Sequence, residues 1–318
     1  MITAHAFWTV APGRGELRSE TLPLEDDGDR LEVHTLASGI SRGTEALVFS
    51  GRVPPSQHAA MRAPLMAGTF PFPVKYGYSA VGRTRDGRRV FVLHPHQDVF
   101  LAARAMCIPV PDGVPTNRAV LGANMETALN VAWDAAALPG ERILVIGAGV
   151  VGLLIASLLT RTAATRVTVI DVDAGKERVV RHLGCRFATP DQAPGEQDLV
   201  VHASATEAGL RLALNRAAFE ARIVEASWFG DLAPSVPLGE AFHSRRLRMI
   251  ASQVGVIAPA MRGRRSHAER LSLALELLAD DRYDALLDGT TRFENMPEAM
   301  PRVLASGGLC HVITYGAE

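Results

Sequence analysis

The sequence predicts an α/β protein in which an irregular β domain precedes a doubly wound parallel sheet. Two observations support this fold class. About the first hundred of the 318 residues are rich in glycine, proline and short β-favouring runs, and they lack a sustained helical period. Beyond residue 115, apolar runs of strand length alternate with helical patterns, which is typical of a parallel sheet with helices on both faces.

Six apolar runs mark the strands of the predicted parallel sheet. They lie at residues 143–146, 167–171, 185–188, 199–203, 222–226 and 248–252. Six strands with helices between most of them match a complete doubly wound nucleotide-binding fold. After the sheet, Ser266 and Glu269 form a capping-box pattern that predicts the start of a helix, and a second, shorter helix is expected near Pro297.

Composition and charge favour a protein that acts on small molecules. The chain is 47% hydrophobic and 21% charged, as expected of a globular protein, and its formal net charge is −1. It therefore lacks the positive field that binds nucleic acids or anionic membranes, and neither partner is expected. Three scattered cysteines and a terminus without a signal pattern predict a reducing, cytoplasmic compartment. The uncharged run 143–160 contains three glycines and is not expected to span a membrane.

A glycine-rich motif joins the first predicted strand of the sheet to a helix. Gly147 permits a tight turn, Gly149 lets the main chain approach a pyrophosphate, and Gly152 allows the helix to pack closely on the strand. The N-terminus of the helix that follows offers free N–H groups and a positive dipole to phosphates, and Val150 and Val151 of the motif are expected to bind the cofactor. The motif predicts a bound dinucleotide.

The end of the next predicted strand indicates which dinucleotide binds. Asp171 stands at the distance from the first glycine where a ribose-binding carboxylate belongs. It favours NAD, because a carboxylate accepts hydrogen bonds from ribose hydroxyls and repels a 2′-phosphate, and Asp173 adds to this repulsion. Lys176 and two nearby arginines could pair with a phosphate, so NADP stays an alternative.

Nearly the whole chain resembles the medium-chain dehydrogenase/reductase superfamily. The resemblance rests on the glycine-rich motif and on three further motifs: Ser38-Gly-Ile-Ser-Arg-Gly-Thr-Glu45, Gly77-Tyr-Ser-Ala-Val-Gly82, and Glu298-Ala-Met through Ser306-Gly-Gly. The first of these also resembles the motif of bacteriochlorophyllide hydroxyethyl dehydrogenases. The resemblance implies a GroES-like catalytic domain at 1–116, a Rossmann domain at 117–255, and a C-terminal segment at 256–318 that returns to the catalytic domain.

Departures from the superfamily pattern predict a zinc-independent member. Zinc-dependent members carry a cysteine ligand where this chain has Ser41, and His-Glu where it has Tyr78 and Ser79. A third ligand position falls near Ala123. Catalytic zinc needs about three ligands of Cys, His or carboxylate type, and neither Ser41 nor Ala123 is one, so no catalytic zinc is expected.

Without zinc, hydrogen-bond donors must stabilise the charge that develops on the substrate oxygen. The expected catalytic residues are Ser41, Thr44, Tyr78, His94, His96 and Glu126. Ser41 and Tyr78 are the leading candidates, although Tyr78 could simply fill space. The two histidines are candidate proton carriers or hydrogen-bonded turn residues, and a metal between them is the less favoured reading. Glu126 is a candidate base, or the partner of an arginine.

The resemblance also implies further contacts with the cofactor. Arg42 is expected at a cofactor phosphate. The other residues expected at the cofactor are Thr127, Val172, Ser204, Ala226 and Ser252.

The sequence therefore predicts an NAD(P)-dependent, zinc-independent oxidoreductase. It would interconvert an alcohol and a carbonyl on a small organic substrate by hydride transfer. An NADPH-dependent quinone or enone reductase and a catalytically inactive nucleotide-binding sensor are the alternatives. The resemblance implies a homodimer joined at sheet edges.

Overall fold

The computed structural model describes residues 1–23 and 29–316. Contacts divide the chain into two compact units. The first consists of Met1–Ala123 together with Leu271–Glu318, and the second is Asn124–Arg270. These boundaries lie later in the chain than the expected ones at residues 116 and 255, and each unit is described by itself.

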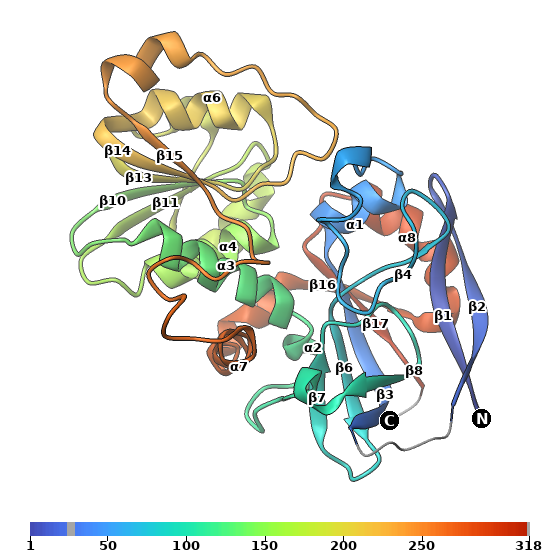
Figure 1. Ribbon diagram of the computed structural model, residues 1–318. Coiled ribbons are helices and arrows are strands. Elements are labelled where there is room, and N and C mark those ends of the chain that lie inside the picture. The colour runs from blue at the N-terminus through green and yellow to red at the C-terminus, as the bar shows by residue number, and fades with distance from the viewer. Residues whose placement is uncertain (24–28, 317–318) are drawn as a thin grey trace. The chain divides into compact units, whose positions relative to one another are not determined.

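The second unit contains a six-stranded parallel sheet (Figure 1). Its strands, in spatial order, are β12 (Arg186–Ala188), β11 (Arg166–Ile170), β10 (Arg142–Ile146), β13 (Gln197–His202), β14 (Ala217–Glu225) and β15 (Arg248–Ala251). Every neighbouring pair is parallel. This order confirms the predicted doubly wound sheet. The direction of strand addition reverses between β10 and β13, which is where such sheets bind ligands at their carboxyl ends.

Helices cover both faces of this sheet. They are α3 (Gly122–Ala135), α4 (Val150–Leu159), α5 (Glu177–His182) and α6 (Glu207–Arg216). Figure 1 shows α6 on one side of the strands, with α3 and α4 on the other. The central strands are apolar on both faces because both are covered, and Ile143, Leu144 and Val145 of β10 are fully buried. The uncharged run 143–160 thus forms a buried strand, a turn and a buried helix.

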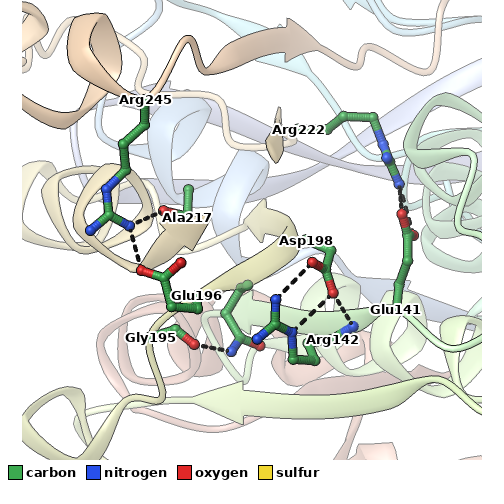
Figure 2. Close-up of polar contacts among 9 residues, drawn as sticks. Glu141, Arg142, Gly195, Glu196, Asp198, Ala217, Arg222 and Arg245 are labelled. Atoms are coloured by element: carbon green, nitrogen blue, oxygen red, sulfur yellow. Dashed lines mark hydrogen bonds and ion pairs between the residues drawn. The ribbon is translucent and has the colours of Figure 1, made fainter. Parts of the chain in front are cut away.

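Ion pairs hold the amino-terminal edge of the sheet, opposite the edge where the glycine-rich turn lies. Figure 2 shows three pairs, each joining neighbouring segments: Arg142 with Asp198, Arg222 with Glu141, and Arg245 with Glu196. Arg142 also donates its backbone N–H to Asp198 at 2.8 Å, and its guanidinium lowers the pKa of that carboxyl. Each partly exposed pair contributes at most about 1 kcal/mol to the stability of the fold. Together the three pairs favour one register of the neighbouring strands.

The first unit is built from β-sheets, as the sequence predicts for the amino-terminal part of the chain. One sheet has the order β2 (Arg14–Leu22), β1 (Ile2–Ala11), β5 (Val74–Lys75) and β4 (Ala67–Gly68). The other has the order β16 (Leu287–Arg292), β17 (Cys310–Thr314), β3 (Arg30–Ile40), β6 (Ala80–Thr84), β7 (Arg89–Val92) and β9 (Ile108–Pro109), and β8 (Val99–Ala103) also pairs with β3. Because β17 runs antiparallel to β3, the end of the chain lies beside the motif that begins at Ser38.

The described residues also form the α-helices α1 (Arg42–Phe49), α2 (Thr116–Ala119), α7 (His267–Leu277) and α8 (Met296–Ala305). The capping box that predicts α7 is confirmed. Ser266 N donates to Glu269 Oε2 at 2.7 Å, and Glu269 N donates to Ser266 Oγ at 3.2 Å. Helix α8 is the second helix expected near Pro297. Within residues 1–23 and 29–316, no helix combines the length and apolar character that a membrane crossing requires.

Candidate functional site

The glycine-rich turn of the second unit has the geometry that a nucleotide fingerprint requires. Gly147 has a φ of +109°, and a Cβ there would lie 2.8 Å from the Ala203 carbonyl oxygen. A Cβ at Gly152 would lie 2.0 Å from the Gly147 oxygen. Neither position has room for a side chain, because the turn, β13 and α4 approach one another closely.

Gly149 differs, since no atom lies within 4 Å of the position that its Cβ would take. It is the N-cap of α4, whose first residues are Val150 and Val151, and no side chain caps this helix. A side chain at Gly149 would fill the space beside the first turn of α4. The structure therefore leaves a cradle at a helix N-terminus, which suits the diphosphate of a dinucleotide.

Asp171 links the second strand of the sheet to this turn. It follows β11, and its Oδ2 accepts a hydrogen bond from Ala148 N at 2.6 Å. Its Oδ1 accepts from Asp173 N at 2.9 Å. A carboxylate has about four acceptor sites, so two remain for ribose hydroxyls. The next residue, Val172, is 86% exposed, and Lys176 lies in the short helix that Asp173 caps.

Residues expected at the cofactor also follow the strands on the other side of the reversal point. Ser204 is the second residue after β13, and Ala226 and Ser252 directly follow β14 and β15. Two charged or titratable side chains here, His202 and Glu225, were missed by sequence reasoning. The signal that could have found them is a polar residue at the end of an otherwise apolar strand.

Glu126 lies on α3, in the second unit, and forms a buried ion pair. Arg270 donates to it through Nε at 3.0 Å, and the same guanidinium donates to Asn130 Oδ1 at 2.7 Å and to the Val254 carbonyl at 2.6 Å. Burial raises the pKa of Glu126, while Arg270 opposes that rise. Of the two roles expected for Glu126, the geometry supports the arginine partner and gives no support to a free base. Thr127 is the next residue on the same helix.

Ser41, Thr44 and Tyr78 come together in the first unit. Ser41 is the N-cap of α1 and Thr44 lies in its first turn. Tyr78 forms hydrogen bonds with both side chains. Burial and the nearby charge of Glu45 raise the pKa of Tyr78 to about 12, although its two hydrogen bonds oppose the shift. The phenol is therefore protonated at neutral pH and can donate a hydrogen bond.

A chain of four buried side chains adjoins these hydroxyl groups. Glu45 Oε1 accepts from Ser41 N at 2.7 Å, and Glu45 Oε2 lies 3.0 Å from His96 Nε2. His96 Nδ1 lies 2.7 Å from Ser38 Oγ, which lies 2.8 Å from the hydroxyl of Tyr315. A carboxylate only accepts, so Nε2 of His96 donates to Glu45. Nδ1 is then free to accept from Ser38, and Ser38 to accept from Tyr315.

His94 has a different environment from His96. Its ring stacks on Phe100 with centroids 3.7 Å apart, and its Nδ1 lies 2.9 Å from the Pro95 carbonyl oxygen. Burial lowers the pKa of His94 to about 3. The imidazole is thus uncharged at neutral pH and packed in the core. The geometry favours its structural role over the predicted one in proton transfer.

Arg42 is held by the C-terminal segment of the chain. Its guanidinium donates to Ser306 Oγ at 2.7 Å, to the Leu309 carbonyl at 2.5 Å and to the Val303 carbonyl. It also borders a hollow of about 300 Å³, whose lining includes Arg302 and His311. The Asp288 carboxylate lines the same hollow and pairs with Arg42 at 3.3 Å, so this guanidinium already has an anionic partner, and a phosphate contact for Arg42 stays a prediction.

The positions at which the resemblance places zinc ligands include Ser41, Tyr78, Ser79 and Ala123. Ser79 donates its hydroxyl to the Val120 carbonyl, and Ala123 is buried. Throughout the described parts, 1–23 and 29–316, no three His, Cys, Asp or Glu side chains gather closely enough to hold a metal ion.

A family model and a curated protein match parts of the chain. Residues 143–224 match the family model described as ketopantoate reductase PanE/ApbA. The L-threonine 3-dehydrogenase of Ruegeria pomeroyi is 27% identical over 128 residues, which are 39% of this chain. The match spans only 36% of that relative's length.

Solved structures match almost the whole chain. The L-idonate 5-dehydrogenase of Escherichia coli K-12 has a TM-score of 0.81 at 12% identity, over 98% of both chains. A short chain alcohol dehydrogenase from E. coli CFT073, complexed with NADH, has a TM-score of 0.78 at 15% identity, over 98% of this chain and 99% of its own. A Sinorhizobium meliloti 1021 protein, assigned to the zinc-binding dehydrogenases and bound to NADP, has a TM-score of 0.78 at 17% identity. The match covers 99% of this chain and 100% of that protein's chain. The chain therefore has the fold of these dehydrogenases.

Proposed function

We propose that the protein is an NAD(H)-dependent oxidoreductase that interconverts an alcohol and a carbonyl without catalytic zinc. The observation that carries the proposal is the Asp171 carboxylate, held by the backbone of the glycine-rich turn beside an open helix N-terminus. This arrangement suits a dinucleotide whose adenosine ribose carries free hydroxyls.

The residues of the second unit would hold the cofactor, which supplies or accepts a hydride when bound. The first turn of α4 would bind the diphosphate, and Asp171 would accept hydrogen bonds from the ribose. Ser204, Ala226 and Ser252 border the same edge of the sheet. The solved relatives that contain NADH or NADP support this assignment.

The residues of the first unit would stabilise the substrate oxygen. Tyr78 donates a hydrogen bond from its protonated phenol, and Ser41 offers a second hydroxyl beside it. As negative charge grows on the oxygen during carbonyl reduction, a preorganised donor stabilises it. The proton of the phenol can then pass to the oxygen and be replaced through the hydroxyls of Ser41 or Thr44.

Location and assembly are part of the proposal. The buried thiols of Cys107, Cys185 and Cys310 are consistent with a reducing cytoplasm. A homodimer joined at sheet edges is consistent with β15, an edge strand on which Met249 is 44% exposed.

The first experiment is a fluorescence titration of metal-analysed protein with NADH and NADPH in parallel. Tighter binding of NADH, followed by turnover with a panel of alcohols and aldehydes, would support the proposal. Tighter binding of NADPH with turnover of quinones or enones would favour a reductase of that class instead. Binding of NADH without turnover would favour a sensor, and one stoichiometric, activity-linked zinc ion would contradict the zinc-free mechanism.

A further inference from the structure

The carboxyl ends of β13 and β14 carry a compact polar cluster, which we call the β13–β14 cluster. It consists of His202, Ser204, Thr206, Glu225 and Ser227. His202 Nδ1 lies 2.7 Å from Glu225 Oε2, and His202 Nε2 lies 2.7 Å from Ser204 Oγ. Glu225 Oε1 accepts from Ser227 N at 2.7 Å. His202 is fully buried and Ser204 is partly exposed, so the cluster leads from the core to the surface of the unit.

The chemistry of these groups determines the direction of each hydrogen bond. An ionised carboxylate only accepts, so His202 donates from Nδ1 to Glu225. In that tautomer Nε2 is an acceptor, and Ser204 must donate its hydroxyl hydrogen inward to His202. The hydroxyl hydrogen of Ser204 is therefore used in the bond to His202, and only the lone pairs of its oxygen remain available.

Thr206 completes this arrangement. Its hydroxyl oxygen accepts from Gly209 N at 3.1 Å and lies 2.9 Å from Ser204 Oγ, so its own hydrogen can be donated to Ser204. Ser204 then donates one hydrogen bond to His202 and accepts one from Thr206, and its oxygen keeps one unused lone pair. The remaining capacity of Ser204 is that of an acceptor.

The cluster lies beside the glycine-rich turn. The position of a Cβ on Gly147 is 2.8 Å from the Ala203 oxygen and 3.0 Å from Ser204 N. Strands β10 and β13 are neighbours at the point where the strand order reverses. A ligand seated on the turn would thus meet Ser204 next, and a sugar hydroxyl is the donor that a dinucleotide offers.

We propose that His202 and Glu225 are positioning residues that orient Ser204 Oγ as an acceptor for a ribose hydroxyl of the bound dinucleotide. This inference rests on the proposed function. The order carboxylate, imidazole, serine is also that of serine hydrolases, in which the serine is a nucleophile. The positioning role is favoured because Ser204 adjoins the nucleotide turn.

A double-mutant cycle on NADH affinity tests the inference. We expect Ser204→Ala to weaken NADH binding about three- to ten-fold, the effect of one hydrogen bond. His202→Gln and Glu225→Gln should weaken it by a similar or smaller factor. In the Ser204→Ala background, His202→Gln should have no further effect, because His202 acts through Ser204. Glu141→Gln, which alters an ion pair at the opposite edge of the sheet, is the matched control and should leave affinity unchanged.

A second measurement does not require the cofactor. Nitrogen-15 NMR of the free protein should show His202 protonated at Nδ1, and this preference should be lost in Glu225→Gln. Equal NADH affinity in wild type and all three single variants would overturn the inference while leaving the proposed function intact. If the single variants lose NADH affinity independently and their losses add in the double variants, His202 and Glu225 do not act through Ser204, which would overturn the inference. Covalent labelling of Ser204 by a fluorophosphonate would overturn the inference, because it would identify Ser204 as a nucleophile. Failure of the wild type to bind either dinucleotide would overturn both this inference and the proposed function.

Discussion

Glu45 and His96 form a pair in the core of the first unit, with Oε2 and Nε2 3.0 Å apart and both side chains at most 3% exposed. The pair has hydrogen-bond partners at each end, since Glu45 also accepts from the Ser41 backbone and His96 also contacts Ser38. Burial of a charge is tolerated only when its hydrogen bonds are satisfied in this way. The pair thereby holds the loop that carries Ser41 next to Tyr78.

Replacing Glu45 by glutamine should destabilise the protein by about 1–3 kcal/mol. The amide offers one acceptor oxygen where the carboxylate offers two, so either Ser41 N or His96 Nε2 would face an N–H group. Urea denaturation of the wild type and the variant measures the change. The exposed pair of Arg292 and Glu294 supplies the control, since Glu294→Gln should change stability by less than about 0.5 kcal/mol. A loss at Glu45 no larger than that of the control would contradict the argument.

Tyr78→Phe should lower kcat for carbonyl reduction about 10²- to 10³-fold, because it removes the donor that stabilises charge on the substrate oxygen. NADH affinity should change much less than kcat, since the hydroxyl that is lost acts on the substrate oxygen and its neighbours are Ser41 and Thr44. The neighbouring Tyr76, whose ring centroid lies 5.9 Å away, provides the matched control as Tyr76→Phe. Similar losses in both variants would point to packing rather than to the Tyr78 hydroxyl.

The pH dependence of that reaction follows from the raised pKa of Tyr78, about 12. The phenol stays protonated up to about pH 11, one unit below its pKa, so its ionisation should not reduce the rate of carbonyl reduction between pH 7 and pH 10. Rates measured over this range, corrected for the stability of NADH, test the point. A fall in rate near pH 9 that is absent from Tyr78→Phe would mean that Tyr78 ionises far more readily than its environment implies.

His94 should make the protein sensitive to acid. Its folded-state pKa of about 3 lies below the unfolded value of about 6.5, so folding favours the uncharged ring. Its contribution to stability is complete above pH 6.5 and is lost as the pH falls from 6.5 toward 3. At pH 5 the loss is about 2 kcal/mol.

The measurement for His94 is the free energy of unfolding at pH 7 and pH 5. His94→Phe keeps an aromatic ring against Phe100 and cannot be protonated, so the drop between the two pH values should shrink by about 2 kcal/mol. His182→Gln, at an exposed histidine, is the control and should keep the wild-type drop. An unchanged drop in His94→Phe would assign the acid sensitivity to other groups.

Asp171→Ala should shift cofactor preference from NADH toward NADPH. Removing the carboxylate deletes hydrogen bonds to the ribose and the repulsion of a 2′-phosphate, so NADH affinity should fall about ten-fold or more and NADPH affinity should rise. Fluorescence titration with both cofactors measures the ratio. The exposed Asp191, replaced by alanine, should leave the ratio at its wild-type value, and a ratio unmoved by Asp171→Ala would remove Asp171 from cofactor selection.

The sequence by itself determined the features that depend on neighbours along the chain. The six strands of the second unit, the turn at Gly147 and the capping box at Ser266 could all be predicted, because periodicity, glycine and side-chain caps act over a few residues. The departures at Ser41 and Tyr78 were also visible, although the protonated state of the phenol depends on Glu45 and on burial.

Only the tertiary structure decided which polar side chains meet. Tyr315 contacts Ser38 because β17 pairs with β3, and no local pattern encodes that pairing. His94 and His96 look equivalent in the sequence, yet one stacks on Phe100 and the other bonds to Glu45. His202 and Glu225 likewise meet because parallel strands bring their carboxyl ends together. The physical reason is the same in each case: hydrogen bonds between distant segments form only after the sheets have brought those segments side by side.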